Sequence, residues 1–259
     1  METTKSVTLS RPKNKLRFDW LVPVLLKPKQ TLAAILEDPK PNWQTPLLAV
    51  GVFGFIELLV AGPIKKLAIQ MGTNLPPGFE YYSAEQQQQF LQAQASQTSP
   101  LFLYVFSALG LVIGILITWF LLRSLLHLSL TVAGSRAKSM LSGNLAAWSF
   151  TPLVLRSVVR IIAMLATKSL VSVKGLAGLI EPSTGLGQFA YAFLAFIDIF
   201  FVWQILLLLF GSEKISNLPR IKAWGACAVA ILILLILEAF PGFIGAQLSG
   251  LSFTRMFFF

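Results

Sequence analysis

Five ionisable residues lie within long apolar stretches of this 259-residue chain: Glu57, Arg156, Arg160, Asp198 and Glu238. One charged side chain at the centre of a membrane helix costs roughly 2.5–3.5 kcal/mol on insertion scales, so we expect these residues to face inward and to pair. Arg156 and Arg160 are four residues apart and would share one helix face. Depth counted along the apolar stretches places Arg156 level with Asp198 near the middle of the membrane. It places Arg160 level with Glu238, with Glu57 near the same depth.

The charge count of this group leaves one carboxylate without an arginine. In one hypothesis the five residues form a network that fixes the order of the helices. In the other, the surplus carboxylate stays protonated in the apolar interior and acts as a proton relay.

The sequence holds few other candidates for chemistry. Its one histidine, His127, and one cysteine, Cys227, cannot supply a metal site with four nitrogen and sulfur ligands. Phosphate-binding Gly-x-x-x-x-Gly-Lys, His-Glu-x-x-His and Gly-x-Ser-x-Gly strings are absent from the sequence. His127 is interpreted either as an interfacial polar residue or as part of a proton relay. We therefore expect no enzymatic activity, no metal and no cofactor.

The composition predicts the elements that must position these residues. Hydrophobic residues make up 55% of the chain and charged residues 12%, against about 45–50% and about 25% in an ordinary soluble domain. Apolar runs long enough to cross roughly 30 Å of hydrocarbon as helices cover residues 46–64, 101–122, 145–167, 188–210 and 223–246. This predicts an all-α polytopic membrane protein with five transmembrane helices in one bundle. Residues 1–45 then form a basic cytoplasmic or interfacial segment, residues 46–246 the membrane domain and residues 247–259 an aromatic tail.

The basic residues predict an orientation. The net charge is +10, and 13 Lys and Arg residues lie in segments on the same side of the membrane as the N-terminus, against five on the other side. Cytoplasmic segments carry the excess of Lys and Arg. We therefore expect the N-terminus in the cytoplasm and the C-terminus outside.

Basic residues before the first span are candidates for contact with a lipid surface. They include Lys13, Lys15, Arg17, Lys27 and Lys29. Each Lys or Arg near an anionic bilayer contributes about 1 kcal/mol of attraction. This favours anionic lipid, and not nucleic acid, as a partner. The segment either lies in the cytoplasmic interface or is an ordered tail packed on the bundle.

Small residues in the second span form a Gly-x-x-x-Gly pair, Gly110 and Gly114. Such a pair lets two helices approach closely. It predicts either self-association of the protein or ordinary packing inside the bundle. Pro152 and Trp203 are assigned the same role in helix packing.

A helix-starting motif lies in the external connection, residues 65–100. Ser83 is followed three residues later by Gln86, which is the spacing of a capping box. The motif predicts a polar helix from Ser83 to about residue 97.

Three groups of residues form a wider pattern along the chain. In the fourth run, Asp198 and Trp203 are followed by Gly211 and then by Lys222-Ala223. The third run contains Pro152, and residues 27–48 before and at the start of the first run contain several prolines. From about residue 27 to residue 246 this pattern resembles the Yip (Ypt-interacting protein) domain family, in its prokaryotic type. The resemblance implies a five-span fold with a cytoplasmic N-terminus, in a prokaryotic cell membrane. It favours a membrane scaffold over an enzyme.

Two functions remain open. One is a non-enzymatic membrane adaptor or accessory subunit, bound to other membrane protein subunits or to itself. The alternative is a small transporter or permease for a proton-coupled solute or lipid. A chain without an internal repeat favours the adaptor, because many transporter folds are built from repeats.

Overall fold

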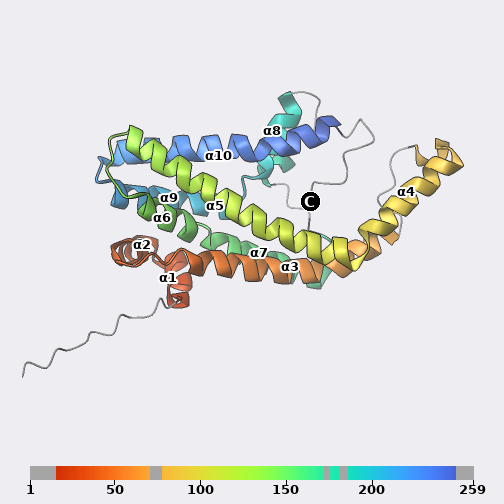
Figure 1. The fold of residues 1–259 in the computed structure, drawn as a ribbon, viewed down its shortest axis with the longest axis horizontal. Coiled ribbons are helices and arrows are strands. Elements are labelled where there is room, and N and C mark those ends of the chain that lie inside the picture. The colour runs from red at the N-terminus through yellow and green to blue at the C-terminus, as the bar shows by residue number, and fades with distance from the viewer. Residues whose placement is uncertain (1–15, 71–77, 172–174, 181–185, 249–259) are drawn as a thin grey trace, which may run out of the picture.

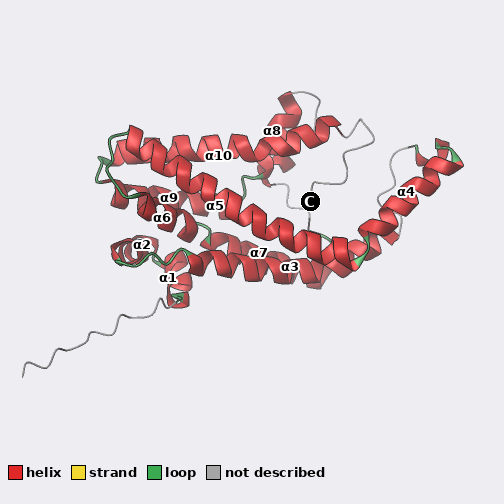
Figure 2. Ribbon diagram, in the orientation of Figure 1, coloured by secondary structure: helices red, strands yellow, loops and turns green. Residues whose placement is uncertain are grey.

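The computed structural model describes residues 16–70, 78–171, 175–180 and 186–248. Lys13, Lys15 and most of the expected aromatic tail lie outside the described residues. Every regular element in the described part is helical (Figure 2). The α-helices are α1 (Leu21–Leu26), α2 (Pro28–Glu37), α3 (Gln44–Gln70), α4 (Ala84–Gln97), α5 (Ser107–Val132), α6 (Ser139–Trp148), α7 (Thr151–Thr167), α8 (Leu186–Ala195), α9 (Ile199–Ser216) and α10 (Arg220–Leu248). Three short 3-10 helices, η1 (Phe18–Trp20), η2 (Phe79–Tyr81) and η4 (Gly175–Leu179), and a π-helical segment, η3 (Leu101–Phe106), complete the list.

Helical segments in five places are long and apolar enough to cross a membrane. They are Gln44–Ile69, Leu101–Val132, Ser139–Thr167, Ile199–Ser216 and Arg220–Ile244. The prediction of an all-helical protein with five spans is confirmed.

The spanning helices run along the long axis of the molecule (Figure 1). α10 packs on α5 and α9, and α3 packs on α7. α1 and α2 lie at one end of the bundle, where the α5–α6 and α9–α10 connections also lie, and α4 extends from the opposite end (Figure 1). The core between the helices includes the fully buried side chains of Trp148, Phe150, Leu122, Leu126 and Leu207.

The third span is two helices, where the sequence predicted one from 145 to 167. α6 ends at Trp148 and α7 begins at Thr151. Pro152 lies in the first turn of α7, where a missing N–H costs nothing because helix-start N–H groups have no partner in the helix. The Thr151 hydroxyl donates to the carbonyl of Trp148 at 2.7 Å. The proline therefore marks the start of a helix and not the middle of one.

The fourth span is also different from the prediction, which placed one helix over 188–210. The structure ends α8 at Ala195 and begins α9 at Ile199. Asp198 has extended backbone angles and its side chain accepts a hydrogen bond from the N–H of Phe201 at 2.8 Å. An aspartate in this position is a favoured N-cap, so Asp198 starts a new helix inside an otherwise continuous apolar run.

A segment distant in sequence supports this break. The Leu176 N–H donates to the carbonyl of Ile197 at 2.9 Å. Gly175 has φ +50, and a Cβ placed there would lie 2.7–2.9 Å from the carbonyl oxygens of Leu194, Ala195 and Ile197. Only glycine fits this close approach of two backbones.

The N-terminal segment is packed on the bundle. Leu32 and Ile35 of α2 are buried, and α2 lies against α9. Val22 and Leu26 of α1, by contrast, are 62% and 73% exposed. The segment therefore combines a packed face with an exposed apolar edge.

The capping box at the start of α4 has formed. The Gln86 N–H donates to the Ser83 hydroxyl, and the Ser83 N–H donates to the Gln86 side chain. The predicted polar helix after Ser83 is confirmed as α4.

Candidate functional site

Two ion pairs join the spanning helices. Arg156 Nη1 lies 3.4 Å from Asp198 Oδ2, and Arg160 Nη1 lies 3.3 Å from Glu57 Oε1. The arginines occupy consecutive turns on one face of α7, as the sequence predicted from their spacing. Their partners belong to α3 and to the start of α9, so the two pairs tie three spans together.

The two ion pairs are partly buried. The Asp198 side chain is 10% exposed and Glu57 is 21% exposed, whereas the two arginines are about 30% exposed. Arg160 Nε is buried and has no hydrogen-bond partner within the described residues. The guanidinium of Arg160 therefore keeps one donor unused.

The third carboxylate has a neutral partner. Thr118 of α5 donates a hydrogen bond from its hydroxyl to Glu238 Oε1 at 3.0 Å. The sequence placed Glu238 level with Arg160, but the ion-pair partner of Arg160 is Glu57. The reason is lateral position, because among the described helices α7 packs most extensively on α3.

The charged group lies well away from the turn between α9 and α10. Asp198 is 18 residues before Ser216, and Glu238 is 18 residues after Arg220. At 1.5 Å per residue both are about 27 Å from the turn between α9 and α10. Charged Glu213 and Lys214 lie between Asp198 and that turn, so the hydrocarbon layer begins nearer to Asp198, and its expected position near the middle of the membrane stays a prediction.

The glycines singled out in the second span do not pack inside the bundle. A Cβ at Gly110 or Gly114 would have nothing within 4 Å among the described residues. The close approach of α3 to the second span uses Gly54 instead, where a Cβ would lie 3.0 Å from the Leu111 side chain. Among the described residues, Gly110 and Gly114 therefore make no close contact with another helix of the chain.

Other residues singled out in the sequence contribute to the core. Pro152 is buried, and Trp203 is half-buried against the core cluster. Cys227 is buried. The backbone carbonyl of His127 accepts from the Thr131 hydroxyl at 2.7 Å. In the described part of the chain, these four residues lie outside the ion pairs and hydrogen bonds of the charged group.

Thr118 and Gly175 are the members of this region that sequence reasoning missed. Thr118 is one of the few polar residues in an apolar run, and this alone could have marked it as a partner for a buried polar group. Gly175 carried no local signal, because its partners are more than 18 residues away.

Comparison with known families identifies the fold that carries this site. The family model of the Yip1 domain matches residues 23–240. The chain belongs to the Yip1 domain family. The match begins in α1 and ends in α10, so the first four spans, most of the fifth and the charged group lie inside the Yip1 domain. No curated protein and no solved structure matches the chain.

Membership and structure together define the general role. A Yip1 domain with five helices of spanning length is a multi-pass membrane protein. Yip1 family proteins are in general not enzymes.

Proposed function

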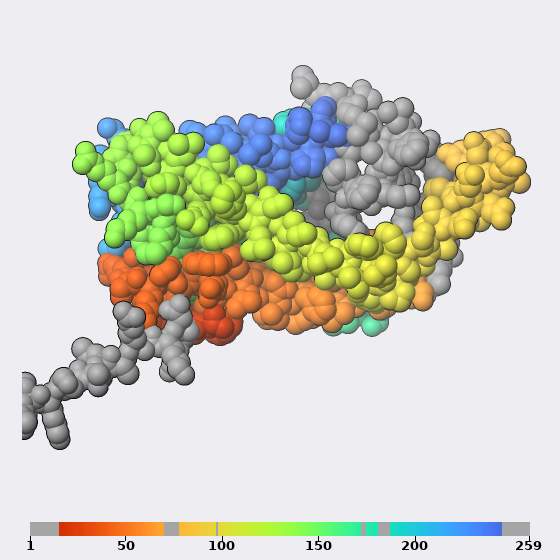
Figure 3. Space-filling view, viewed as in Figure 1, coloured from red at the N-terminus to blue at the C-terminus, as the bar shows by residue number. Residues whose placement is uncertain are grey.

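We propose that this Yip1 domain protein is a non-enzymatic integral membrane adaptor or accessory subunit that holds another membrane protein through the outer face of α5. Burial supports this assignment. In the most apolar stretch of the Leu101–Val132 span, 11% of the residues are buried by the rest of the chain. The corresponding share for the Ile199–Ser216 span is 44%. α5 crosses one face of the molecule, between α10 and α3 (Figure 3).

The open glycines carry the proposal. A methyl group added at Gly110 or Gly114 would meet nothing within 4 Å among the described residues, and Leu109 and Ile113 beside them are 52% and 53% exposed. Without a side chain at two positions one turn apart, the backbone of a second helix can come close. A transmembrane helix of a partner subunit fits this face.

The charged group has a supporting role in this proposal. Its two ion pairs join α7 to α3 and to the start of α9, which holds the bundle in one arrangement. A fixed bundle presents the α5 face at low entropic cost to a partner.

Photo-crosslinking in native membranes tests the proposal. A photoreactive residue at Ile113 is expected to give one crosslinked membrane protein. The same residue at Ile162 of α7, which is 61% exposed, should give no such product. Gly114→Leu should abolish the product without lowering thermal stability, because the new side chain enters open space. A product containing two copies of this chain, or equal products from both positions, would contradict an adaptor that binds a different protein.

A second candidate function is a small transporter or permease for a proton-coupled solute or lipid. The observation that favours it is the pairing of Glu238 with the Thr118 hydroxyl, where an arginine would fix the charge. Glu238→Gln in proteoliposomes containing a pH-sensitive dye separates the two functions. A transporter would lose proton movement in the variant. An adaptor would show no proton movement before or after the change and would keep its crosslink from Ile113.

A further inference from the structure

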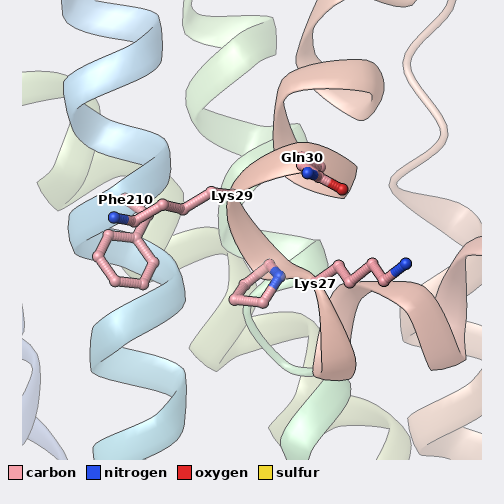
Figure 4. A pocket seen from close by; sticks show the side chains of 5 residues that line it. Lys27, Lys29, Gln30 and Phe210 are labelled. Atoms are coloured by element: carbon pink, nitrogen blue, oxygen red, sulfur yellow. The ribbon is translucent and has the colours of Figure 1, made fainter.

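A shallow cavity of about 360 Å³, wide open to the surface, lies where the start of α2 meets α9 (Figure 4). It is lined by Lys27, Pro28, Lys29, Gln30 and Phe210. α1 and α2 lie at one end of the bundle (Figure 1), and Phe210 is 12 residues past Asp198, about 18 Å along α9 at 1.5 Å per residue. It therefore forms a separate site.

The cavity carries positive charge that the rest of the described chain does not neutralise. Lys29 Nζ lies 4.9 Å above the centre of the Phe210 ring, whereas the Lys27 side chain extends in the opposite direction, away from the ring (Figure 4). Among the described residues neither lysine belongs to an ion pair. Glu37, the acid at the far end of α2, is paired with Lys214 at 2.9 Å. Two ammonium groups are thus available to an anion.

Phe210, which lines the cavity, also belongs to an apolar stripe on α9. Val202, Leu206 and Phe210 are spaced four residues apart on α9, which places them on one face of that helix. Val202 and Leu206 are 42% and 44% exposed. From Phe210 to Val202 the stripe is about 12 Å long at 1.5 Å per residue, and it lies within the Ile199–Ser216 span.

We propose that this cavity binds the phosphate headgroup of an anionic phospholipid, with one acyl chain lying along the Val202–Leu206–Phe210 stripe. The ammonium group of Lys29 and, after rotation of its side chain, that of Lys27 balance the phosphate. A free phosphate ion would use the lysines but leave the stripe uncovered, and a neutral lipid would use the stripe but leave the lysines unbalanced. An anionic lipid satisfies both.

The exposed apolar edge of α1 agrees with this position. Leu26, the residue before Lys27, is 73% exposed, and Val22 one turn earlier is 62% exposed. Apolar residues flanked by lysines are typical of segments that lie in the headgroup layer of a membrane. The cavity is thus at the level where a lipid phosphate would be found.

Native mass spectrometry of the full-length protein in mild detergent tests the lysines. Phosphatidylglycerol is expected to bind more tightly than phosphatidylcholine with the same acyl chains. Lys29→Ala should weaken phosphatidylglycerol binding about fivefold, and Lys27→Ala with Lys29→Ala by more, since each lysine contributes separately to attraction of an anionic lipid. Lys222→Ala, a change of an exposed lysine at the start of α10 that does not line the cavity, should have no effect on the tight site.

A second arm tests the apolar stripe and the source of the phosphate. Leu206→Gln should weaken phosphatidylglycerol binding, whereas Leu206→Met should retain it. Glycerol phosphate at the same concentration should not displace the lipid. Equal binding of the two lipids, an equal loss in Lys222→Ala, or displacement by glycerol phosphate would overturn the proposal. Because Leu206 is partly exposed on the surface of α9, both of its variants are expected to fold, and thermal unfolding checks this.

Discussion

Arg156 on α7 binds Asp198, the residue that caps the N-terminus of α9. Its Nη1 atom lies 3.4 Å from Asp198 Oδ2, while Asp198 Oδ1 accepts the N–H of Phe201 at 2.8 Å. One carboxylate therefore caps a helix with one oxygen and balances an arginine with the other. The ion pair and the break in the fourth apolar run depend on the same side chain.

Removing either partner of this pair should destabilise the bundle. Asp198→Asn keeps an N-cap side chain but removes the charge, and Arg156→Leu removes the guanidinium. Each change leaves the other group poorly solvated and should cost about 3 kcal/mol. The double variant should recover at least about 1 kcal/mol of the summed loss. Thermal unfolding in detergent measures all four proteins, and strictly additive losses would show that the two residues do not interact.

The capping role of Asp198 can be separated from its charge. Asp198→Ala removes both the charge and the acceptor for the Phe201 N–H, whereas Asp198→Asn removes the charge alone. Loss of an N-cap costs about 1 kcal/mol. In the Arg156→Leu background, where the ion pair is already absent, we expect Ala at position 198 to be less stable than Asn by that amount. Equal stability of the two would remove the capping role.

The sequence predicted depth well enough to match one ion pair and not the other. Counting residues along each apolar run gives a side chain's level in the membrane, and on that basis Arg156 was matched with Asp198. It does not give lateral position. Arg160 was placed level with Glu238, yet its partner is Glu57, because α3 is the neighbour of α7. Which helices are neighbours is decided by packing across the whole bundle.

Local signals were predicted more reliably than interruptions of long apolar runs. Ser83 and Gln86 form a motif within one turn, and α4 begins where that motif predicts. At Asp198, one polar residue in a long hydrophobic run was taken as a membrane-embedded charge within a helix. Its function as a cap is supported by Gly175 and Leu176, which are far away in the sequence. Because the apolar run from 188 to 210 is long enough for one spanning helix, nothing in the sequence indicated its division into α8 and α9.

The contact between Gly175 and the α8–α9 break should be sensitive to a single methyl group. Gly175→Ala would place a Cβ within 2.9 Å of three carbonyl oxygens at a φ of +50. Strained backbone of this kind costs about 1–3 kcal/mol. Gly51→Ala is the matched control, since it lies within α3 and a Cβ there meets nothing within 4 Å among the described residues. We expect the control to be neutral or more stable by roughly 0.5–1 kcal/mol, as measured by thermal unfolding. Equal effects of the two changes would contradict the close approach.

The orientation of the protein in the membrane can be tested at the two ends of the bundle. α4 and the connection between α5 and α6 lie at opposite ends (Figure 1). In a Cys227→Ala background, a cysteine replacing exposed Gln92 of α4 should react with a membrane-impermeant maleimide in intact cells. A cysteine replacing exposed Arg136 in the α5–α6 connection should react only after permeabilisation. The reason is the 13 to five division of Lys and Arg between the two sides, which favours the α1 and α2 end on the cytoplasmic face. The reverse labelling pattern would place that end, and with it the Lys29 cavity, outside the cell.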